Sequence, residues 1–340
     1  DVDIFVKFNY NKYNDRSDKI SSILEKVLKK FKISKLHGSR DYFQIKKEGI
    51  TFEIVPILDI KKASQAKNIT DVSPLHALWV NKHKNQDDIR LAKAFAKAQH
   101  VYGAETHQKG FSGYVIEVLV IYYGGFDKLI KNIARWKEKT VLDPENLLKN
   151  PLNELGKEKI KSPLVLVDPV DKTRNAAAAL SKEKYNFFIK ACKKYLKNPS
   201  EKFFIWEEEK IPKDSLAVEI KNIKGKKDVI GGKMRSLFEK LKRQLIIEGY
   251  VIVKSGFIFS DSIIKFWFKF KKDSLSRIRE VRGPPVKNIK HLERFKKKHK
   301  KIFVRKNIAY AKEKRQFTHA KNFIKHWLKN NNIKNFRLTL

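Results

Sequence analysis

Two aspartates separated by one residue stand in the opening stretch of the chain, Asp1-Val2-Asp3. Successive side chains of a β-strand alternate between its two faces, so Asp1 and Asp3 share one face. The other face carries apolar residues that we expect to enter a core, namely Val2, Ile4, Val6 and Phe8. A third carboxylate, Glu53, lies in a second apolar stretch, Ile50 to Pro56. If the two strands are neighbours, three carboxylates converge on one patch.

Carboxylates held this close repel each other unless cations lie between them. Mg²⁺ prefers oxygen ligands and is commonly shared between carboxylates and substrate phosphates. The patch of Asp1, Asp3 and Glu53 therefore indicates phosphoryl-transfer chemistry. The bland alternative is a set of exposed acids on a solvated strand face, and Asp-x-Asp alone does not decide between the two.

Two further segments carry groups suited to phosphates or bases. In Asp71 to His76, the hydroxyl of Ser73 and the imidazole of His76 follow the acidic strand and could bond phosphate oxygens, although such a segment is often an ordinary cap and turn. The run from Val167 to Ala177 pairs two acids with Arg174. Its structural alternative is a turn held by an ion pair.

A helix predicted over Asp87 to His100 places Arg90, Lys93 and Lys97 on one face, and Tyr102 follows it. The alternative is a solvated basic face. Gly110 to Tyr114 then opens another helix with small residues, which allows close packing or close approach of a ligand.

The net charge of +39 over 340 residues indicates a polyanionic partner, either nucleic acid or an anionic membrane surface. The stretch from Val281 to Leu340 contains nineteen lysines and arginines but only two acids. The aromatic residues among them could stack on bases, but several recur at helical spacing and are better explained by packing: Phe295, Phe303, Tyr310, Phe317, Phe323, Trp327 and Phe336.

The single cysteine, Cys192, lies in a helical pattern, so disulfides are excluded and zinc clusters are not expected. No apolar run is long enough to cross a membrane, and the acidic start is not a signal peptide, so we expect a cytoplasmic protein.

The pattern of the chain changes twice. A helix at Ser17 to Ile33 and a hairpin around Glu48-Gly49 predict a sheet backed by a helix. Helices then dominate, and an α+β region follows from Asp214. The helices expected in the middle are Asp87 to His100, Ser112 to Tyr123, Phe126 to Lys137 and Ser181 to Leu196. The later elements expected are a strand at Leu216 to Ile223, a helix at Gly232 to Glu248, and strands at Tyr250 to Phe257 and Ile263 to Lys271.

Taken in this order, these segments resemble the class I, archaeal-type CCA-adding enzymes, tRNA nucleotidyltransferases of the polymerase-β-like superfamily. The most specific matches are Ser73-Pro74 with His76, the stretches Val101 to Glu105 and Gly110 to Tyr114, and the run Asp168 to Ala177. The resemblance implies an α+β, multidomain fold. Its parts would be a nucleotidyltransferase head (1–79, incomplete at its start), a helical neck (80–199), a ferredoxin- or RRM-like α+β body (200–272) and a basic tRNA-binding tail (273–340).

The resemblance also implies roles for single residues. Asp1, Asp3 and Glu53 would hold two Mg²⁺ ions, one at the tRNA 3′-hydroxyl and one at the nucleotide phosphates. Four residues match positions that contact the incoming triphosphate: Ser73, His76, Lys93 and Tyr102. Arg174 matches the arginine that reads the base edges of CTP and ATP. The partner would be tRNA, held by its acceptor and TψC arms, and a homodimer is left open.

Two features depart from the family pattern. An upstream helix and a Gly-Ser motif precede the Asp-x-Asp strand in the family, whereas this chain begins after them; it is either a fragment or lacks part of the triphosphate clamp. Glu53 stands where a family member has Asp, which lengthens the ligand by one methylene.

Other functions stay open at this point. One is another superfamily member, such as a poly(A) polymerase or an oligoadenylate synthetase. A second is a non-catalytic tRNA-binding protein. Binding to a membrane surface is the weakest, because no strongly amphipathic segment is evident.

Overall fold

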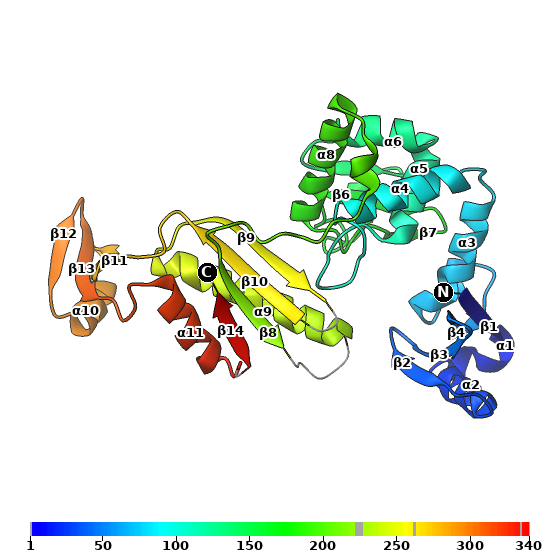
Figure 1. The fold of residues 1–340 in the computed structure, drawn as a ribbon, viewed down its shortest axis with the longest axis horizontal. Coiled ribbons are helices and arrows are strands. Elements are labelled where there is room, and N and C mark those ends of the chain that lie inside the picture. The colour runs from blue at the N-terminus through cyan, green and yellow to red at the C-terminus, as the bar shows by residue number, and fades with distance from the viewer. Residues whose placement is uncertain (1, 222–226, 261–262, 334, 340) are drawn as a thin grey trace. The chain divides into compact units, whose positions relative to one another are not determined.

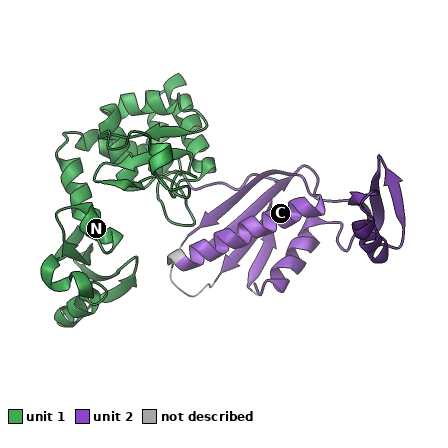
Figure 2. Ribbon diagram, turned by 180° about the vertical axis from the view of Figure 1, so that it is seen from behind, with its two compact units in different colours: residues 1–207 green, residues 208–340 purple. Residues whose placement is uncertain are grey.

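The structure is a computed structural model that describes residues 2–221, 227–260, 263–333 and 335–339; Asp1 lies outside the described residues. The chain divides into two compact units, Asp1–Glu207 and Glu208–Leu340 (Figure 2).

Unit 1 starts with a mixed four-stranded sheet, the N-terminal sheet, in the order β1-β4-β3-β2 (Figure 1). Its elements and those up to the next region are β1 (Val2–Asn9), α1 (Tyr10–Tyr13), α2 (Ile20–Leu28), β2 (Ser34–His37), β3 (Asp41–Lys47), β4 (Ile50–Asp59) and α3 (Ser73–Asn81). β1 runs parallel to β4, and the other neighbours are antiparallel. The predicted hairpin is confirmed, with Glu48 and Gly49 at φ 51° and 77° in a two-residue turn.

Helix α2 covers one face of this sheet, where Leu24 and Leu28 pack with Phe43 and Ile54. The expected burial of the apolar face of β1 holds only in part. Val6 and Phe8 pack against this cluster, but Val2 and Ile4 are 43% and 41% exposed. The cause is local: β1 is an edge strand, and α2 covers only the part of it that includes Val6 and Phe8.

A buried ion pair joins the loop before β3 to the segment before α3. Arg40 donates to both carboxylate oxygens of Asp71, and the side chain of Asp71 is 0% exposed. Asp71 also accepts from the backbone N–H of Leu58, and Arg40 donates to the carbonyl of Pro56 at 3.1 Å. Two parts of β4 are thus tied to one charged pair.

Asp71→Ala should destabilise unit 1 by about 3–5 kcal/mol, because it leaves the Arg40 charge buried without its partner. Chemical denaturation followed by circular dichroism measures the loss. Asp59→Asn is the matched control, because Asp59 forms a pair with Lys7 in which both side chains are 56% exposed. Such a surface pair contributes little. Equal stability of the two variants would contradict the assigned role of the buried pair.

The second half of unit 1 is the helical region, residues 82–207. Its elements are α4 (Gln86–Ala98), α5 (Gly113–Tyr123), α6 (Phe126–Ile133), β5 (Thr140–Leu142), α7 (Pro151–Glu154), β6 (Leu164–Asp168), β7 (Asp171–Asn175) and α8 (Lys182–Lys197). The four predicted helices are confirmed. The expected helical neck also contains strands, because β5, β6 and β7 form a small sheet whose central strand β6 is fully buried.

Unit 2 contains a four-stranded sheet, the body sheet, in the order β14-β8-β10-β9. Its strands are β8 (Leu216–Lys221), β9 (Ile252–Phe259), β10 (Ile263–Phe270) and β14 (Phe336–Thr339), and its helices are α9 (Lys227–Glu248) and α11 (Ala320–Asn330). The predicted strand at Leu216 to Ile223 is described only to Lys221. Both helices cover the same face of the sheet, as Figures 1 and 2 show from opposite sides.

A second sheet, the insert, lies between β10 and α11 in the chain. It consists of β11 (Ile278–Pro285), α10 (Ile289–Lys298), β12 (Ile302–Arg305) and β13 (Ile308–Lys314), with strand order β11-β13-β12. The two chain segments that connect it to the body run together, since the N–H of Arg315 bonds the carbonyl of Arg277 at 2.8 Å.

Residues 273–340 therefore do not form the separate basic tail that the sequence predicts. Ile324 and Leu328 of α11 are fully buried in the core of the body, and Leu338 of β14 packs there too. These residues belong to the body, whereas residues 278–314 form the insert. The packing interpretation of the aromatic residues also holds for Phe323, Trp327 and Phe336.

Candidate active site

Asp3 and Glu53 are direct partners in the parallel register of β1 and β4. Register partners point to the same face of a sheet, and Ile54 packs toward α2, so both carboxylates lie on the face opposite that helix. Gln44 of β3 also pairs with Glu53, and its amide donates to Glu53 Oε1 at 2.6 Å. One amide donor orients Glu53, while Asp3 is exposed.

Oxygen ligands on one sheet face fit a hard divalent cation. Within the described residues no group of three acids, histidines or cysteines could hold a metal ion. Asp1, the third predicted ligand, lies outside them. Asp3 and Glu53 supply a two-carboxylate donor set that fits a hard divalent cation.

A second cluster joins α3, α5 and the β6–β7 hairpin around Asp168, whose side chain is 0% exposed. His76 Nε2 lies 3.0 Å from Asp168 Oδ2, and Arg174 Nη1 donates to the same oxygen at 2.5 Å. Tyr114 Oη donates to Oδ1 at 3.0 Å, and the imidazole of His76 stacks on its ring with centroids 4.0 Å apart. Two predicted site residues, His76 and Arg174, thus meet at one carboxylate.

The surroundings shift the pKa of Asp168 and the pKa of Tyr114 in opposite directions. Burial alone would raise the pKa of Asp168. Stronger effects hold this pKa below its ordinary value: the hydrogen bond and charge of His76, the N–H of Val170 and the charge of Arg174. Burial and the adjacent Asp168 charge raise the pKa of Tyr114. Asp168 is a carboxylate that only accepts hydrogen bonds, and Tyr114 keeps its proton and donates.

A third cluster contains Lys93 and Tyr102. Lys93 of α4 forms an ion pair of 2.5 Å with Glu117 of α5. A Cβ atom added at Gly113 would lie 2.8 Å from Tyr102 Oη and 3.7 Å from Lys93 Cε, so both side chains approach the start of α5 closely because this residue is glycine. Tyr114 of the Asp168 cluster is the next residue, so the two clusters meet at the first turn of α5.

Gly110 allows a close approach, and the neighbour that approaches it is the backbone of Val101. A Cβ atom there would lie 2.1 Å from the carbonyl oxygen of Val101, and the N–H of Phe111 bonds that oxygen at 2.7 Å. Residues 101–103 and 110–111 thereby run side by side and fix Tyr102. Ser112 caps α5 by accepting from the N–H of Val115.

The other predicted residues are placed less tightly. Ser73, half-buried, begins α3, with Pro74 in its first turn. Arg90 is exposed and pairs with Asp87, away from the Glu117 contact of Lys93. Lys97 lies over the ring of Tyr102 at 5.0 Å.

Four residues that make these contacts are not among the site residues that the sequence predicts, namely Gln44, Tyr114, Glu117 and Asp168. Glu117 carried a signal, because it is the only acid in the apolar helix Gly113–Tyr123. Asp168 and Tyr114 lie in two of the segments that carry the family resemblance. Gln44 could be found from the predicted hairpin, which places its strand next to the strand of Glu53.

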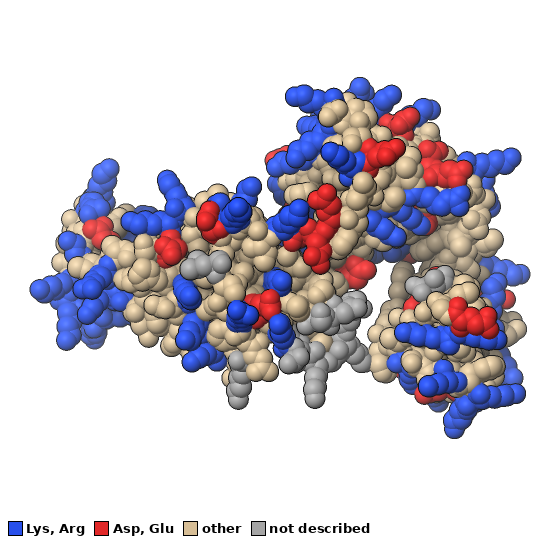
Figure 3. Space-filling model, viewed as in Figure 1, with Lys and Arg blue, Asp and Glu red and all other residues tan. Residues whose placement is uncertain are grey.

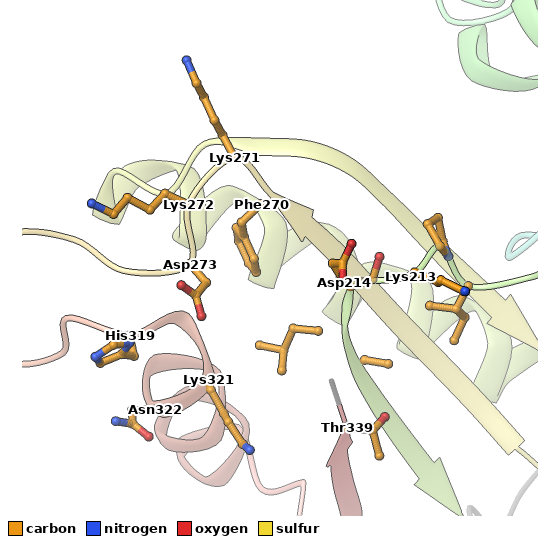
Figure 4. A pocket seen from close by; sticks show the side chains of 15 residues that line it. Lys213, Asp214, Phe270, Lys271, Lys272, Asp273, His319, Lys321, Asn322 and Thr339 are labelled. Atoms are coloured by element: carbon orange, nitrogen blue, oxygen red, sulfur yellow. The ribbon is translucent and has the colours of Figure 1, made fainter.

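A cavity of about 1150 Å³ lies in unit 2, at the ends of β8 and β10 and the start of α11. None of the predicted site residues lines it. Figure 4 shows Lys271 and Lys272 extending outward from it and Asp273 turned inward, so these two lysines do not form a cradle for an anion.

The chain matches two family models in sequence. Residues 87–205 match the second domain of tRNA nucleotidyltransferases, and residues 215–334 match the C-terminal domain of the CCA-adding enzyme. The CCA-adding enzyme of Nanoarchaeum equitans is 36% identical over 315 residues, which are 90% of this chain and 78% of that protein. This chain belongs to the CCA-adding enzyme family.

A second CCA-adding enzyme, that of Methanocaldococcus jannaschii, is 29% identical over 358 residues, which cover 99% of this chain and 79% of the relative. The resemblance inferred from motifs is thus confirmed, and the chain is a tRNA nucleotidyltransferase enzyme of mixed α+β fold. A solved structure titled mtPAP in apo form has a TM-score of 0.38 and 10% identity, covering 55% of this chain and 50% of that one. So low a score does not establish a shared fold.

Within the family, Lys93, Tyr102 and Arg174 fall in the segment that matches the second-domain model. The C-terminal match includes the insert and α11. In the described part of the chain, no helix combines the length and apolar character needed to cross a membrane.

Proposed function

We propose that this CCA-adding enzyme builds the 3′-terminal CCA of tRNA from CTP and ATP at the face of the N-terminal sheet that carries Asp3 and Glu53. The observation that supports it best is the register pairing of these two carboxylates in the same compact unit as the clusters of His76, Arg174 and Lys93. Asp1, Asp3 and Glu53 would hold two Mg²⁺ ions. Such ions, when bound, would supply Lewis-acid activation of the tRNA 3′-hydroxyl and neutralise charge on the triphosphate and the departing pyrophosphate.

The chain's own residues bind and orient the nucleotide. Four side chains donate to the triphosphate oxygens, namely Lys93, Tyr102, Ser73 and His76. Arg174 offers its remaining donors to the base, since one guanidinium nitrogen is committed to Asp168 and the side chain is 32% exposed. Cytosine and adenine present acceptors where uracil and guanine present N–H groups, so a guanidinium fork favours CTP and ATP.

The tRNA is held by charge. Residues 278–314 carry fourteen lysines and arginines against three acids. Figure 3 shows these cations gathered where α10, β12 and β13 lie. Such a surface binds the phosphate backbone without reading sequence, so one insert serves the acceptor and TψC arms of every tRNA. We also propose residues 1–79 as the catalytic head and 80–199 as the neck.

The proposal is tested with a tRNA transcript that ends before CCA. Radiolabelled CTP and ATP with Mg²⁺ should give addition of two C and one A, followed by arrest. A homopolymer would favour a poly(A) polymerase-like enzyme, and binding without incorporation would favour a non-catalytic tRNA-binding protein.

A division of labour between Arg174 and Lys93 gives a second test. Arg174→Ala should relax discrimination against UTP and GTP, whereas Lys93→Ala should lower kcat/KM for all four nucleotides alike, by about 10- to 100-fold for one charge-assisted hydrogen bond. Steady-state kinetics with each nucleotide measure both effects. Arg90→Ala, on the same helix as Lys93 but exposed, is the matched control and should change neither. Unchanged selectivity in Arg174→Ala would show that Arg174 does not recognise the base.

A further inference from the structure

Asp168 receives four hydrogen-bond donors although no solvent reaches its side chain. Tyr114 Oη and the N–H of Val170 each donate to Oδ1 at 3.0 Å. His76 Nε2 and Arg174 Nη1 contact Oδ2 at 3.0 and 2.5 Å. A buried carboxylate is costly unless it is paired and fully hydrogen-bonded, and this one is both.

This arrangement fixes which atoms of His76 stay available. A carboxylate only accepts, so Nε2 of His76 carries a proton and donates to it. The ring is also held flat against Tyr114, at an interplanar angle of 27°. Nδ1 is therefore the nitrogen that remains for another contact.

The same carboxylate fixes Arg174. Nη1 is bound to Asp168, while no described contact occupies Nη2 or Nε. A guanidinium is planar, so fixing one nitrogen restricts the plane in which the other donors lie. An arginine on a five-residue strand such as β7 would otherwise sample several rotamers, and an unoriented fork discriminates poorly between base edges.

We propose that Asp168 is a positioning residue for nucleotide selectivity: it holds the Arg174 fork in the plane that reads the base and holds His76 on the triphosphate side. The inference rests on the proposed function, in which Arg174 reads the base. The competing explanation is that the Asp168–Arg174 pair only stabilises the β6–β7 turn. Loss of stability follows from both, but a change in base selectivity follows only from positioning.

The test compares Asp168→Asn, Arg174→Ala and the double variant. The amide keeps the shape of the side chain but removes its charge. We expect Asp168→Asn to lower the ratio of kcat/KM for CTP over UTP by tenfold or more, close to the effect of Arg174→Ala. The double variant should lose no more selectivity than Arg174→Ala alone, because residues that act as one unit are not additive. A wild-type ratio in Asp168→Asn, with a lowered Tm, would overturn the proposal.

Chemical rescue covers the case in which Asp168→Asn does not fold. Millimolar guanidinium should restore part of the CTP preference of Arg174→Ala, because the Asp168 carboxylate can hold a free guanidinium in the vacated space. The same concentration should not rescue Arg174→Ala combined with Asp168→Asn. Absence of rescue in Arg174→Ala would count against the proposal. Arg90→Ala is the matched control: this exposed arginine pairs with Asp87 instead of Asp168, so its loss should leave selectivity unchanged.

Failure of the proposed function is distinguishable from failure of this inference. Wild-type CMP addition tests the function alone. Side-chain NMR of the Arg174 Nε–Hε group in the nucleotide-free protein tests positioning without any reaction. That signal should be that of an ordered group in the wild type and become averaged in Asp168→Asn; an unchanged signal would contradict the inference.

Discussion

Asp3→Ala and Glu53→Ala are each expected to lower the rate of nucleotide addition by about 10³-fold or more, because groups that bind catalytic metals act as a unit and fail together. Single-turnover incorporation of CMP at saturating Mg²⁺ and CTP measures the loss. Glu53→Asp shortens the ligand by one methylene and should retain most activity. Gln44→Ala removes only the amide that orients Glu53, so its effect should be smaller than that of Glu53→Ala.

Asp59→Asn is the control for these variants, since it lies on the same strand as Glu53 but at its far end, in an exposed pair with Lys7. It should keep the wild-type rate. Near-normal turnover in an alanine variant would exclude that residue from the active site.

Deleting residues 319–340 should abolish cooperative unfolding of unit 2. The deletion removes α11 and β14, and with them Ile324 and Leu328, both 0% exposed, and the strand that pairs with β8. Burying one such aliphatic side chain contributes about 1.5–3 kcal/mol. A whole domain is stable by only about 5–15 kcal/mol, so the loss of several is not tolerated. Thermal unfolding of residues 208–340 by circular dichroism, with and without the deletion, measures this.

Excising the insert, residues 278–314, is the contrasting change. A short Gly-Ser linker can replace it, because Arg277 and Arg315 already lie within one backbone hydrogen bond of each other. The body should stay folded, while tRNA binding weakens. The log–log slope of binding against salt should flatten by about 0.7–0.9 for each tRNA phosphate that the protein no longer neutralises.

A cooperative transition after the 319–340 deletion would contradict the assigned packing. An unchanged slope after the excision would show that the insert does not hold the tRNA.

Local patterns predicted much of the fold and of the candidate site. Side-chain alternation predicted that Asp3 and Glu53 share a face if their strands are neighbours, and the register shows that the strands are neighbours. Helix periodicity located α4, α5, α6 and α8. These features depend on neighbours close in sequence or on a period of two or 3.6 residues, so they can be read before any tertiary contact is known.

What the patterns could not predict depends on contacts between distant segments. His76 and Asp168 are 92 residues apart, and nothing local at either residue announces the other. β14 is only four residues long and follows polar residues, so it resembled a tail; its strand character comes from pairing with β8. Strands β5 and β7 are likewise short, at three and five residues.

The pairing of β14 with β8 has a consequence for synthesis on the ribosome. The partners Phe336 and Ile220 are separated by more than a hundred residues, so β8 emerges well before the strand that completes its edge. At about 5–20 residues per second, the interval is on the order of ten seconds. Throughout it, the free edge of β8 and the apolar face awaiting α11 are open to other nascent chains and to chaperones. Unit 1, whose described elements all precede residue 208, can fold while this vulnerable period lasts.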